Sequence, residues 1–325
     1  MDMKKHELGR SGIMVTSVGM GVLSIGRTQL DLPLAEGADV VGYALDRGIN
    51  FLDTAEWYQT YKYIAEALRT RRGAAGFTMP VVASKSLETS YDAMAAAIDD
   101  MRRDLDLDVI DIFLLHEVRQ HPDFANRAGA WECLNEMKAK GAVKAIGIST
   151  HYTDVAELNV YLTGSDVIFP LINKNSLGIR RGEGFGTKED MAAAIARNSA
   201  VGKGVFTMKA FGGGNLTGEY RACLDYVSAL PGVDSVMVGL GARREVDDLV
   251  AWAEGRLDLA YAPDISHKRI RVDEGDCEGC GVCARRCPNG AIHMNEYGVA
   301  KVDHEVCLTC GYCAPACPVR AIIMY

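Results

Sequence analysis

The fold of the C-terminal part of this chain is decided by the stretch CEGCGVCARRCPNGAI at residues 277–292, which returns as CLTCGYCAPACPVRAI at residues 307–322. Both copies read C-x2-C-x2-C-x3-C-P, and the second copy begins 30 residues after the first. A proline after the fourth cysteine of each copy stops a helix from continuing beyond it. Eight of the ten cysteines therefore belong to one repeated pattern, which is far more specific than any other feature of the chain.

This cysteine run is the one that bacterial-type ferredoxins use to hold [4Fe-4S] clusters through thiolates. In two-cluster ferredoxins the fourth cysteine of each run ligates the other cluster. The repeat therefore predicts two clusters, each with three cysteines from one copy and one from the other. The first ligand set is Cys277, Cys280, Cys283 and Cys317, and the second is Cys307, Cys310, Cys313 and Cys287.

Zinc sites and disulfides fit the pattern less well than clusters do. Zinc normally takes two C-x2-C pairs, whereas these runs are triplets with a distant fourth ligand. Disulfides belong to secreted chains, and residues 1–10 lack the apolar segment of a signal peptide. Cluster thiolates and this N-terminus together predict a cytoplasmic location. Cys133 and Cys223 lie outside the repeats and are expected to be buried structural thiols.

Length and composition limit the remaining classes of protein. The chain has 325 residues, of which 48% are apolar, so it has room for a barrel of about 250 residues and a small second module. No run of 18 or more apolar residues is present, so no membrane interaction is expected. The formal net charge of −8 argues against nucleic-acid binding.

Strand-like and helix-like segments alternate through the first 250 residues. The eight strands are expected at residues 15–22, 49–55, 80–85, 109–116, 143–149, 167–173, 204–210 and 233–239. Helical periodicity lies between them, for example at residues 35–48, 90–105, 128–141 and 188–202. Strict alternation of eight such units is typical of a parallel (β/α)8 TIM barrel, although it leaves an open doubly wound sheet as an alternative.

The predicted fold is therefore α/β: a barrel over residues 1–262, followed by a small α+β ferredoxin-like domain with two [4Fe-4S] clusters over residues 263–325. Barrel enzymes place their chemistry at the C-terminal ends of the strands. Asp53, Lys85 and His116 stand at the ends of the second, third and fourth strands, and Tyr58 follows Asp53 by five residues. Each has an ordinary explanation alone, but at successive strand ends they predict a catalytic site.

The segments around these residues, DTAEWY, ASK and LLH, resemble the Asp-Tyr-Lys-His tetrad of aldo-keto reductases, from about Lys4 to Glu254. VKAIGISTH and GVFTMKAFGGGNL resemble the branch of that family with a C-terminal 4Fe-4S ferredoxin domain. The resemblance implies that Tyr58 protonates a carbonyl oxygen that His116 orients. Lys85 is expected to lower the pKa of Tyr58, and Asp53 to hold Lys85 in place.

The resemblance also implies a nicotinamide cofactor. It places the carboxamide against Ser149 and Asn173, and the pyrophosphate along Lys209 and Phe211. Gly212 and Gly239 follow the seventh and eighth strands, where barrels commonly bind phosphate. The residues that usually grip the 2′-phosphate align with Gly239 and Glu245, and Arg243 could replace them, so the sequence leaves NADH and NADPH both open.

Three functions follow from these features. The leading hypothesis is a nicotinamide-dependent enzyme that interconverts a small carbonyl substrate and its alcohol, with a ferredoxin module that covers the barrel or exchanges electrons with a ferredoxin or another electron-transfer protein. The alternative is a ferredoxin-linked reductase in which the clusters deliver electrons to the substrate site, directly or through a flavin, although no flavin motif is visible. The third is a non-catalytic redox sensor, which the intact tetrad disfavours.

Overall fold

The computed structural model describes residues 3–27, 29–264, 269–287, 290–307 and 313–324. Eight parallel strands form a closed barrel in the order β11, β12, β3, β4, β5, β6, β7 and β8. This confirms the predicted barrel over the open sheet. The strands are β3 (Val18–Gly21), β4 (Phe51–Asp53), β5 (Val81–Ser86), β6 (Ile110–Leu115), β7 (Val143–Thr150), β8 (Val167–Pro170), β11 (Gly204–Thr207) and β12 (Ser235–Gly239).

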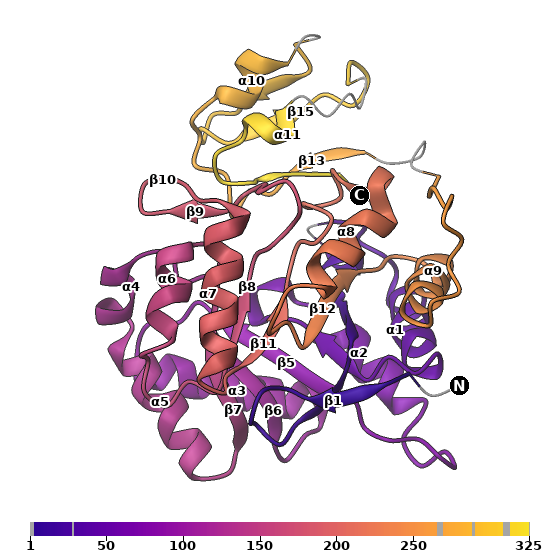
Figure 1. The fold of residues 1–325 in the computed structure, drawn as a ribbon, viewed down its shortest axis with the longest axis vertical. Helices are drawn as coiled ribbons and strands as arrows, with labels where there is room; N and C mark the ends of the chain where they lie inside the picture. Colours follow the sequence, from indigo (N-terminus) through magenta and orange to yellow (C-terminus); the bar gives the residue numbers. More distant parts are fainter. Residues whose placement is uncertain (1–2, 28, 265–268, 288–289, 308–312, 325) are drawn as a thin grey trace.

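Helices surround the barrel on its outer face, as Figure 1 shows. They are α1 (Leu34–Asp46), α2 (Tyr61–Arg69), α3 (Tyr91–Leu105), α4 (His121–Asn126), α5 (Ala128–Ala139), α6 (Thr153–Asn159), α7 (Lys188–Ala200), α8 (Tyr220–Ser228) and α9 (Arg243–Ala253). Local sequence fixes the starts of two of them, because Ser90 accepts a hydrogen bond from the amide of Ala93 and Thr187 from that of Asp190. The short 3-10 helices are η1 (Val22–Ile25), η2 (Glu56–Tyr58) and η3 (Thr217–Glu219).

The first predicted strand, at residues 15–22, is two strands in the structure. β2 (Met14–Thr16) pairs with β1 (Lys5–Glu7) in a hairpin, and only β3 enters the barrel. The chain changes direction at Thr16, whose hydroxyl donates to the Val18 carbonyl while its amide donates to the Asn50 side chain. Leu8 and Val15 of the hairpin are fully buried in the same apolar cluster as the barrel interior, so the hairpin closes the barrel floor.

The barrel interior is filled with apolar side chains below the strand ends. Phe169 and Phe206 stack there with ring centroids 4.3 Å apart. The Nζ atom of Lys85 lies 5.0 Å above the centre of the Phe169 ring, so the polar layer begins directly on top of this apolar one. A second small hairpin, β9 (Arg180–Arg181) and β10 (Gly184–Phe185), follows β8.

The second domain has its own small core and consists of two similar halves. Its elements are β13 (Ile270–Val272), α10 (Val282–Arg286), β14 (Ile292–Met294), β15 (Ala300–Val302), α11 (Cys313–Ala316) and β16 (Ile322–Met324). β13 pairs with β16 and β14 with β15, both antiparallel. The barrel elements end with α9, so the predicted boundary at residue 263 falls in the connection between α9 and β13.

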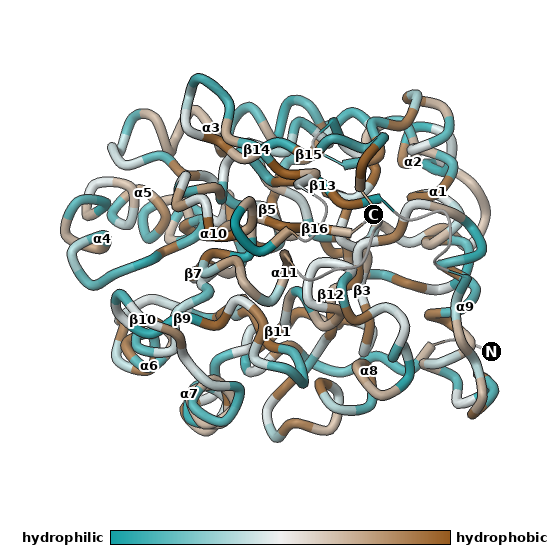
Figure 2. The backbone as a smooth tube through the Cα atoms, turned by 90° about the horizontal axis from the view of Figure 1, so that it is seen from above, coloured by the Kyte–Doolittle hydropathy of each residue, from teal (hydrophilic) through white to brown (hydrophobic). Residues whose placement is uncertain are grey.

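This domain lies over the C-terminal ends of the barrel strands, as Figures 1 and 2 show from the side and from above. Specific bonds join the two domains. The amide of Met324 donates to the Gly213 carbonyl at 2.9 Å, and the Asn215 side chain donates to the Ile322 carbonyl at 3.2 Å. Arg180 donates to the Pro318 carbonyl at 2.8 Å. Among the described residues, no helix combines the length and apolar composition that a membrane crossing requires.

Candidate active site and iron–sulfur module

The four residues predicted as a tetrad meet at the C-terminal end of the barrel. The Lys85 ammonium donates to the Asp53 carboxylate at 2.7 Å and to the Thr54 carbonyl at 2.6 Å. The Tyr58 hydroxyl lies 3.4 Å from Nε2 of His116, and the two rings meet edge to face with centroids 5.5 Å apart. Lys85 lies 5.0 Å from the centre of the Tyr58 ring. One face of the site therefore presents a phenol and an imidazole side by side.

The expected lowering of the pKa of Tyr58 by Lys85 is wrong for this structure. Burial raises the pKa of Tyr58 well above its usual value, and the carboxylates of Asp53 and Asp276 raise it further. The Lys85 ammonium bonds to Asp53 and to the Thr54 carbonyl, and the opposite charge of Asp53 offsets its effect on the phenol. Tyr58 is therefore a neutral phenol at physiological pH, and a neutral phenol carries the proton that a general acid must donate.

His116 is also neutral, because burial and the nearby cation of Lys85 lower its pKa well below the usual value. Its Nδ1 atom is buried and has no hydrogen-bond partner in the described parts of the chain. The backbone on both sides of the site is held by Arg127, which donates to the carbonyls of His116 at 2.7 Å and Ser86 at 2.8 Å. Sequence reasoning missed Arg127, since nothing in its local sequence shows that its guanidinium turns inward from the start of α5.

We expect Asp53→Asn to lower the free energy of unfolding by about 3 kcal/mol, because it leaves the buried Lys85 ammonium without its counter-charge. The side chains of Lys85 and Asp53 are only 1% and 8% exposed, so water cannot replace the lost partner. Denaturant unfolding measures the change. As a control, Arg69→Ala removes an exposed ion pair with Glu66 and should leave the free energy of unfolding nearly unchanged. Equal effects of the two variants would contradict this account.

Charged side chains from both domains gather at the mouth of the barrel above the tetrad. Lys209, after β11, forms an ion pair with Asp276 of the second domain at 3.5 Å. Glu117, after β6, pairs with Arg119, and burial together with Asp276 raises the pKa of Glu117 to about 7. The ring of Trp57 packs against Gly275, where an added Cβ would come within 2.9 Å of it. The second domain thus forms part of the wall around the site.

The residues predicted to hold the nicotinamide carboxamide lie at two neighbouring strand ends. Ser149 is the penultimate residue of β7, and its hydroxyl accepts a hydrogen bond from the Glu117 amide at 2.8 Å. Asn173 follows β8 and is fully buried. Its side chain bonds to the amide and the carbonyl of Leu177, both at 2.9 Å. The structure therefore shows Asn173 organising its own loop, with one amide hydrogen left for another acceptor.

The predicted phosphate loop follows β11. Lys209 and Gly212 both have positive φ angles, of 59° and 56°, and Phe211 turns away to stack on Tyr220 with ring centroids 4.7 Å apart. Gly212 lies against a guanidinium from the second domain, since an added Cβ would come within 2.8 Å of Nη2 of Arg320. That guanidinium is buried and has no hydrogen-bond partner among the described residues. A cationic donor group beside a glycine loop is chemistry that suits a phosphate.

The loop after β12 is less suited to binding a phosphate than the loop after β11. The amide of Gly241 donates to the Glu245 carboxylate at 2.7 Å, so an acidic group already occupies this end of α9. Gly239 is covered by Ser24, whose hydroxyl would meet an added Cβ at 2.1 Å. Arg243 turns toward α1, where it pairs with Asp39 and stacks 4.7 Å from the centre of the Tyr43 ring. Arg243 is therefore engaged elsewhere.

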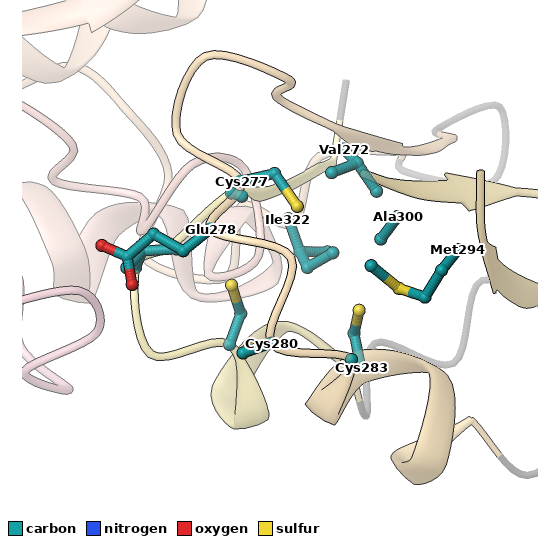
Figure 3. A pocket seen from close by; sticks show the side chains of 12 residues that line it. Val272, Cys277, Glu278, Cys280, Cys283, Met294, Ala300 and Ile322 are labelled. Carbon is teal, nitrogen blue, oxygen red and sulfur yellow. The ribbon is translucent and has the colours of Figure 1, made fainter. Parts of the chain in front are cut away.

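The second domain contains a cavity surrounded by cysteines. Cys277, Cys280, Cys283 and Cys317, the predicted first ligand set, all line it. In Figure 3 the labelled cysteines turn their sulfur atoms toward a common space. Apolar side chains, including Val272, Ile322 and Met294, complete the lining. The crossing cysteine that lines this cavity thus comes from the other copy of the repeat, as the predicted first ligand set requires.

The predicted second ligand set is described only in part. Cys307, Cys313 and Cys287 belong to the core of the second domain or pack against it. Cys310 lies outside the described residues. The two remaining cysteines, Cys133 on α5 and Cys223 on α8, are fully buried in the barrel domain, as expected for structural thiols. Burial raises the pKa of each to about 11.

The fold and the site define a class of protein: a TIM barrel with an Asp-Lys-Tyr-His site, joined to a cysteine-rich second domain. Sequence comparison gives the family. The signature of the aldo/keto reductase family matches residues 17–228, and that of the 4Fe-4S dicluster domain matches residues 266–321. The chain therefore belongs to the aldo/keto reductase family and carries a C-terminal 4Fe-4S dicluster domain.

The curated relatives match this chain over part of its length and at modest sequence identity. The 6-dehydroglucose reductase of Novosphingobium aromaticivorans is 33% identical over 180 residues, which cover 48% of this chain and 55% of the relative. The D-threo-aldose 1-dehydrogenase of a Pseudomonas species is 26% identical over 189 residues, covering 49% and 57% of the two chains. The chain thus spans about half the length of the curated relatives that it matches.

Solved structures share the barrel. A chain from Pseudomonas aeruginosa described as an aldo-keto reductase has a TM-score of 0.65 and 24% identity, covering 79% of this chain and 99% of its own. An aldo-keto reductase of Bacillus halodurans in its holo form has a TM-score of 0.62 and 21% identity, covering 79% and 93%. At these identities the likeness describes the fold.

Proposed function

We propose that this chain interconverts a carbonyl group and an alcohol at the site formed by Tyr58, His116, Lys85 and Asp53, with a nicotinamide cofactor as its redox partner. The observation that supports this best is the 3.4 Å separation of the Tyr58 hydroxyl and Nε2 of His116. A single substrate oxygen placed beside them can hydrogen-bond to both groups. Both are neutral, so the phenol donates a proton while the imidazole orients and polarises the oxygen.

The remaining members of the tetrad act through position and charge. Lys85 and Asp53 form a buried pair beneath the phenol, which holds the ring in place and keeps the floor of the site polar. The nicotinamide supplies a hydride when it is bound. Ser149 and Asn173 would hold its carboxamide end, while Lys209, Gly212 and the buried guanidinium of Arg320 would face its phosphates. The second domain lies over the mouth of the barrel, where lower exposure to water would strengthen the charge interactions.

We propose that the C-terminal domain holds two [4Fe-4S] clusters with the ligand sets predicted from the repeat. The cavity lined by Cys277, Cys280, Cys283 and Cys317 supports the first set, including the crossing cysteine. One contact favours a second function for the clusters, in which they deliver electrons to the substrate site. Asp276, which bonds with Lys209 in the barrel mouth, directly precedes the cluster ligand Cys277. The module and the tetrad are therefore neighbours.

Anaerobic turnover measurements test these functions. The reconstituted protein is mixed with a panel of aldehydes and ketones, once with NADH or NADPH and once with a viologen reduced by dithionite. Consumption of nicotinamide in proportion to alcohol formed supports the proposal. Alcohol formation with reduced viologen alone supports the ferredoxin-linked alternative instead. Absence of product under both conditions would contradict carbonyl reduction at this site.

We expect NADH to bind at least about tenfold more tightly than NADPH, because the Glu245 carboxylate that bonds to Gly241 would repel a 2′-phosphate at this end of α9. Dissociation constants from quenching of protein fluorescence measure the preference. Glu245→Gln should reduce it by removing the negative charge while keeping the shape of the side chain. Arg243→Ala should have little effect, since Arg243 is bound to Asp39. Tighter binding of NADPH by the unchanged protein would contradict this prediction.

A further inference from the structure

Arg320 occupies a backbone position that the other half of its own domain gives to glycine. The repeat aligns CPVR, ending at Arg320, with CPNG, ending at Gly290. Both residues have left-handed backbone angles, with φ of 60° and 66°. Glycine adopts this conformation freely, whereas a long side chain adopts it at a cost of about 1 kcal/mol or more. The structure therefore carries an arginine where the local backbone favours glycine.

The side chain of Arg320 leaves its own domain and reaches the loops at the C-terminal end of the barrel. Its stem covers Gly178, where an added Cβ would come within 1.7 Å of Cγ. Its guanidinium reaches the loop after β11, because Nη2 lies 2.8 Å from the place of a Cβ on Gly212 and 3.6 Å from that of one on Gly213. Larger residues at Gly178 or Gly212 would exclude it. The two glycines thus leave a channel that the arginine fills.

The guanidinium is a buried cation without a hydrogen-bond partner among the described residues, and Cys317 is the one group that favours its charge. Arg320 is 2% exposed, and Nε, Nη1 and Nη2 all lack a hydrogen-bond partner within the described parts of the chain. The side chains beside it, Leu177 and Leu216, are apolar. Burial lowers the pKa of Arg320 to about 10, which leaves it protonated at neutral pH. An uncompensated buried charge costs several kcal/mol, so this group requires an anion.

We propose that Arg320 is an anion-binding residue that the iron–sulfur domain supplies to the barrel, and that its ligand is a phosphate group bound at the glycine loop after β11. Loops after the last strands of a TIM barrel are common phosphate sites. A guanidinium binds phosphate through parallel, charge-assisted hydrogen bonds. The inference rests on the proposed function only for its choice of a dinucleotide as the natural source. A phosphorylated substrate carries the same chemistry.

The site is incomplete in either domain alone. The barrel provides the glycine loop and the channel over Gly178, and the module provides the charge. The bonds from Met324 to Gly213 and from Asn215 to Ile322 fix the register between them. Phosphate binding and docking of the module therefore stabilise each other, as any ligand that binds across an interface must.

Two variants with unbranched side chains test the charge. Arg320→Lys and Arg320→Met both keep an unbranched stem and the same backbone strain, and they differ in charge. The probe is inorganic pyrophosphate, and the measurements are calorimetric affinity and the shift in Tm that pyrophosphate causes. We expect Arg320→Met to weaken binding by about 10- to 100-fold and to abolish the Tm shift, and Arg320→Lys to keep part of both. Equal binding by the two variants and the unchanged protein would overturn the proposal.

Further measurements separate the sources of the phosphate and exclude a purely structural role. If Arg320→Met weakens the binding of NADH as well as that of pyrophosphate, the natural ligand is the dinucleotide. If it weakens the binding of pyrophosphate alone, the natural ligand is a phosphorylated substrate. Because pyrophosphate alone is the primary probe, the site can be established even if nicotinamide is not the cofactor. If Arg320 instead balances the charge of a cluster, Arg320→Met shifts the cluster reduction potential and leaves pyrophosphate binding unchanged, which would overturn the proposal.

Discussion

Tyr58→Phe is expected to lower the rate of carbonyl reduction by about 10² to 10⁴-fold, since it removes the only atom of that ring that can donate a proton. Among the described residues the phenol oxygen makes one hydrogen bond, at 3.4 Å to His116, so its loss should hardly change the free energy of unfolding. Cofactor affinity should also be unchanged. Steady-state kcat with a test aldehyde, beside a thermal unfolding curve, measures both quantities.

Tyr61→Phe is the matched control for this experiment. Tyr61 is buried, and its hydroxyl bonds to that of Ser84 on β5 at 2.7 Å. It is not placed to reach the substrate oxygen beside His116. We therefore expect Tyr61→Phe to retain most of the turnover while losing some stability. If Tyr58→Phe turned over like the unchanged protein, another group would have to be the acid.

Cys317→Ala is expected to have the second largest effect, a loss of about half of the iron bound by the chain. Cys317 is the ligand that we propose the second copy of the repeat contributes to the cavity of the first, so its removal would leave three thiolates for one cluster. Because the cavity is the core of a small domain, we also expect the domain to lose cooperative unfolding. Iron content per chain and the absorbance near 400 nm measure the effect.

Cys133→Ala provides the control for that experiment. Cys133 is buried in the barrel domain on α5, far in sequence from the repeats, and should leave the iron content unchanged. Loss of all iron in Cys317→Ala would indicate that the two clusters assemble cooperatively. Full retention of iron would contradict the crossing assignment, and the cavity would then require another fourth ligand.

The sequence predicted the barrel well because its signal is local. Each strand is a short apolar run, and the residues that end the runs, such as Asp53 and Lys85, meet in the structure as the barrel topology requires. The strands predicted at residues 167–173 and 204–210 end earlier in the structure, at Pro170 and Thr207. The largest error, at residues 15–22, arose because Val15 and Val18 continue the same apolar pattern through a turn. Only the bonds of Thr16 to Asn50, 34 residues away, show that the chain changes direction there.

The electrostatics and the docking of the module could not be predicted, because they depend on contacts between distant segments. The pKa of Tyr58 is set by burial and by Asp276, which belongs to another domain. Arg127 and Arg320 are ordinary arginines in the sequence, and only the fold shows that their guanidinium groups turn into the barrel. For Arg320 the sequence contains one clue, which lies in the repeat. The second copy has Arg320 at the position where the first copy has Gly290.

The pairing of β13 with β16 has a consequence for how the protein matures. Ile270 lies opposite Met324, so the first and last strands of the module are partners. During synthesis the barrel can fold as it emerges, because domains generally fold in order from the N-terminus. The module cannot close until β16 has been synthesised, and Cys317 lies five residues before that strand begins. We therefore expect iron and sulfide to enter the first cavity only after β16 has been made, when the barrel that precedes it in the sequence can already be folded.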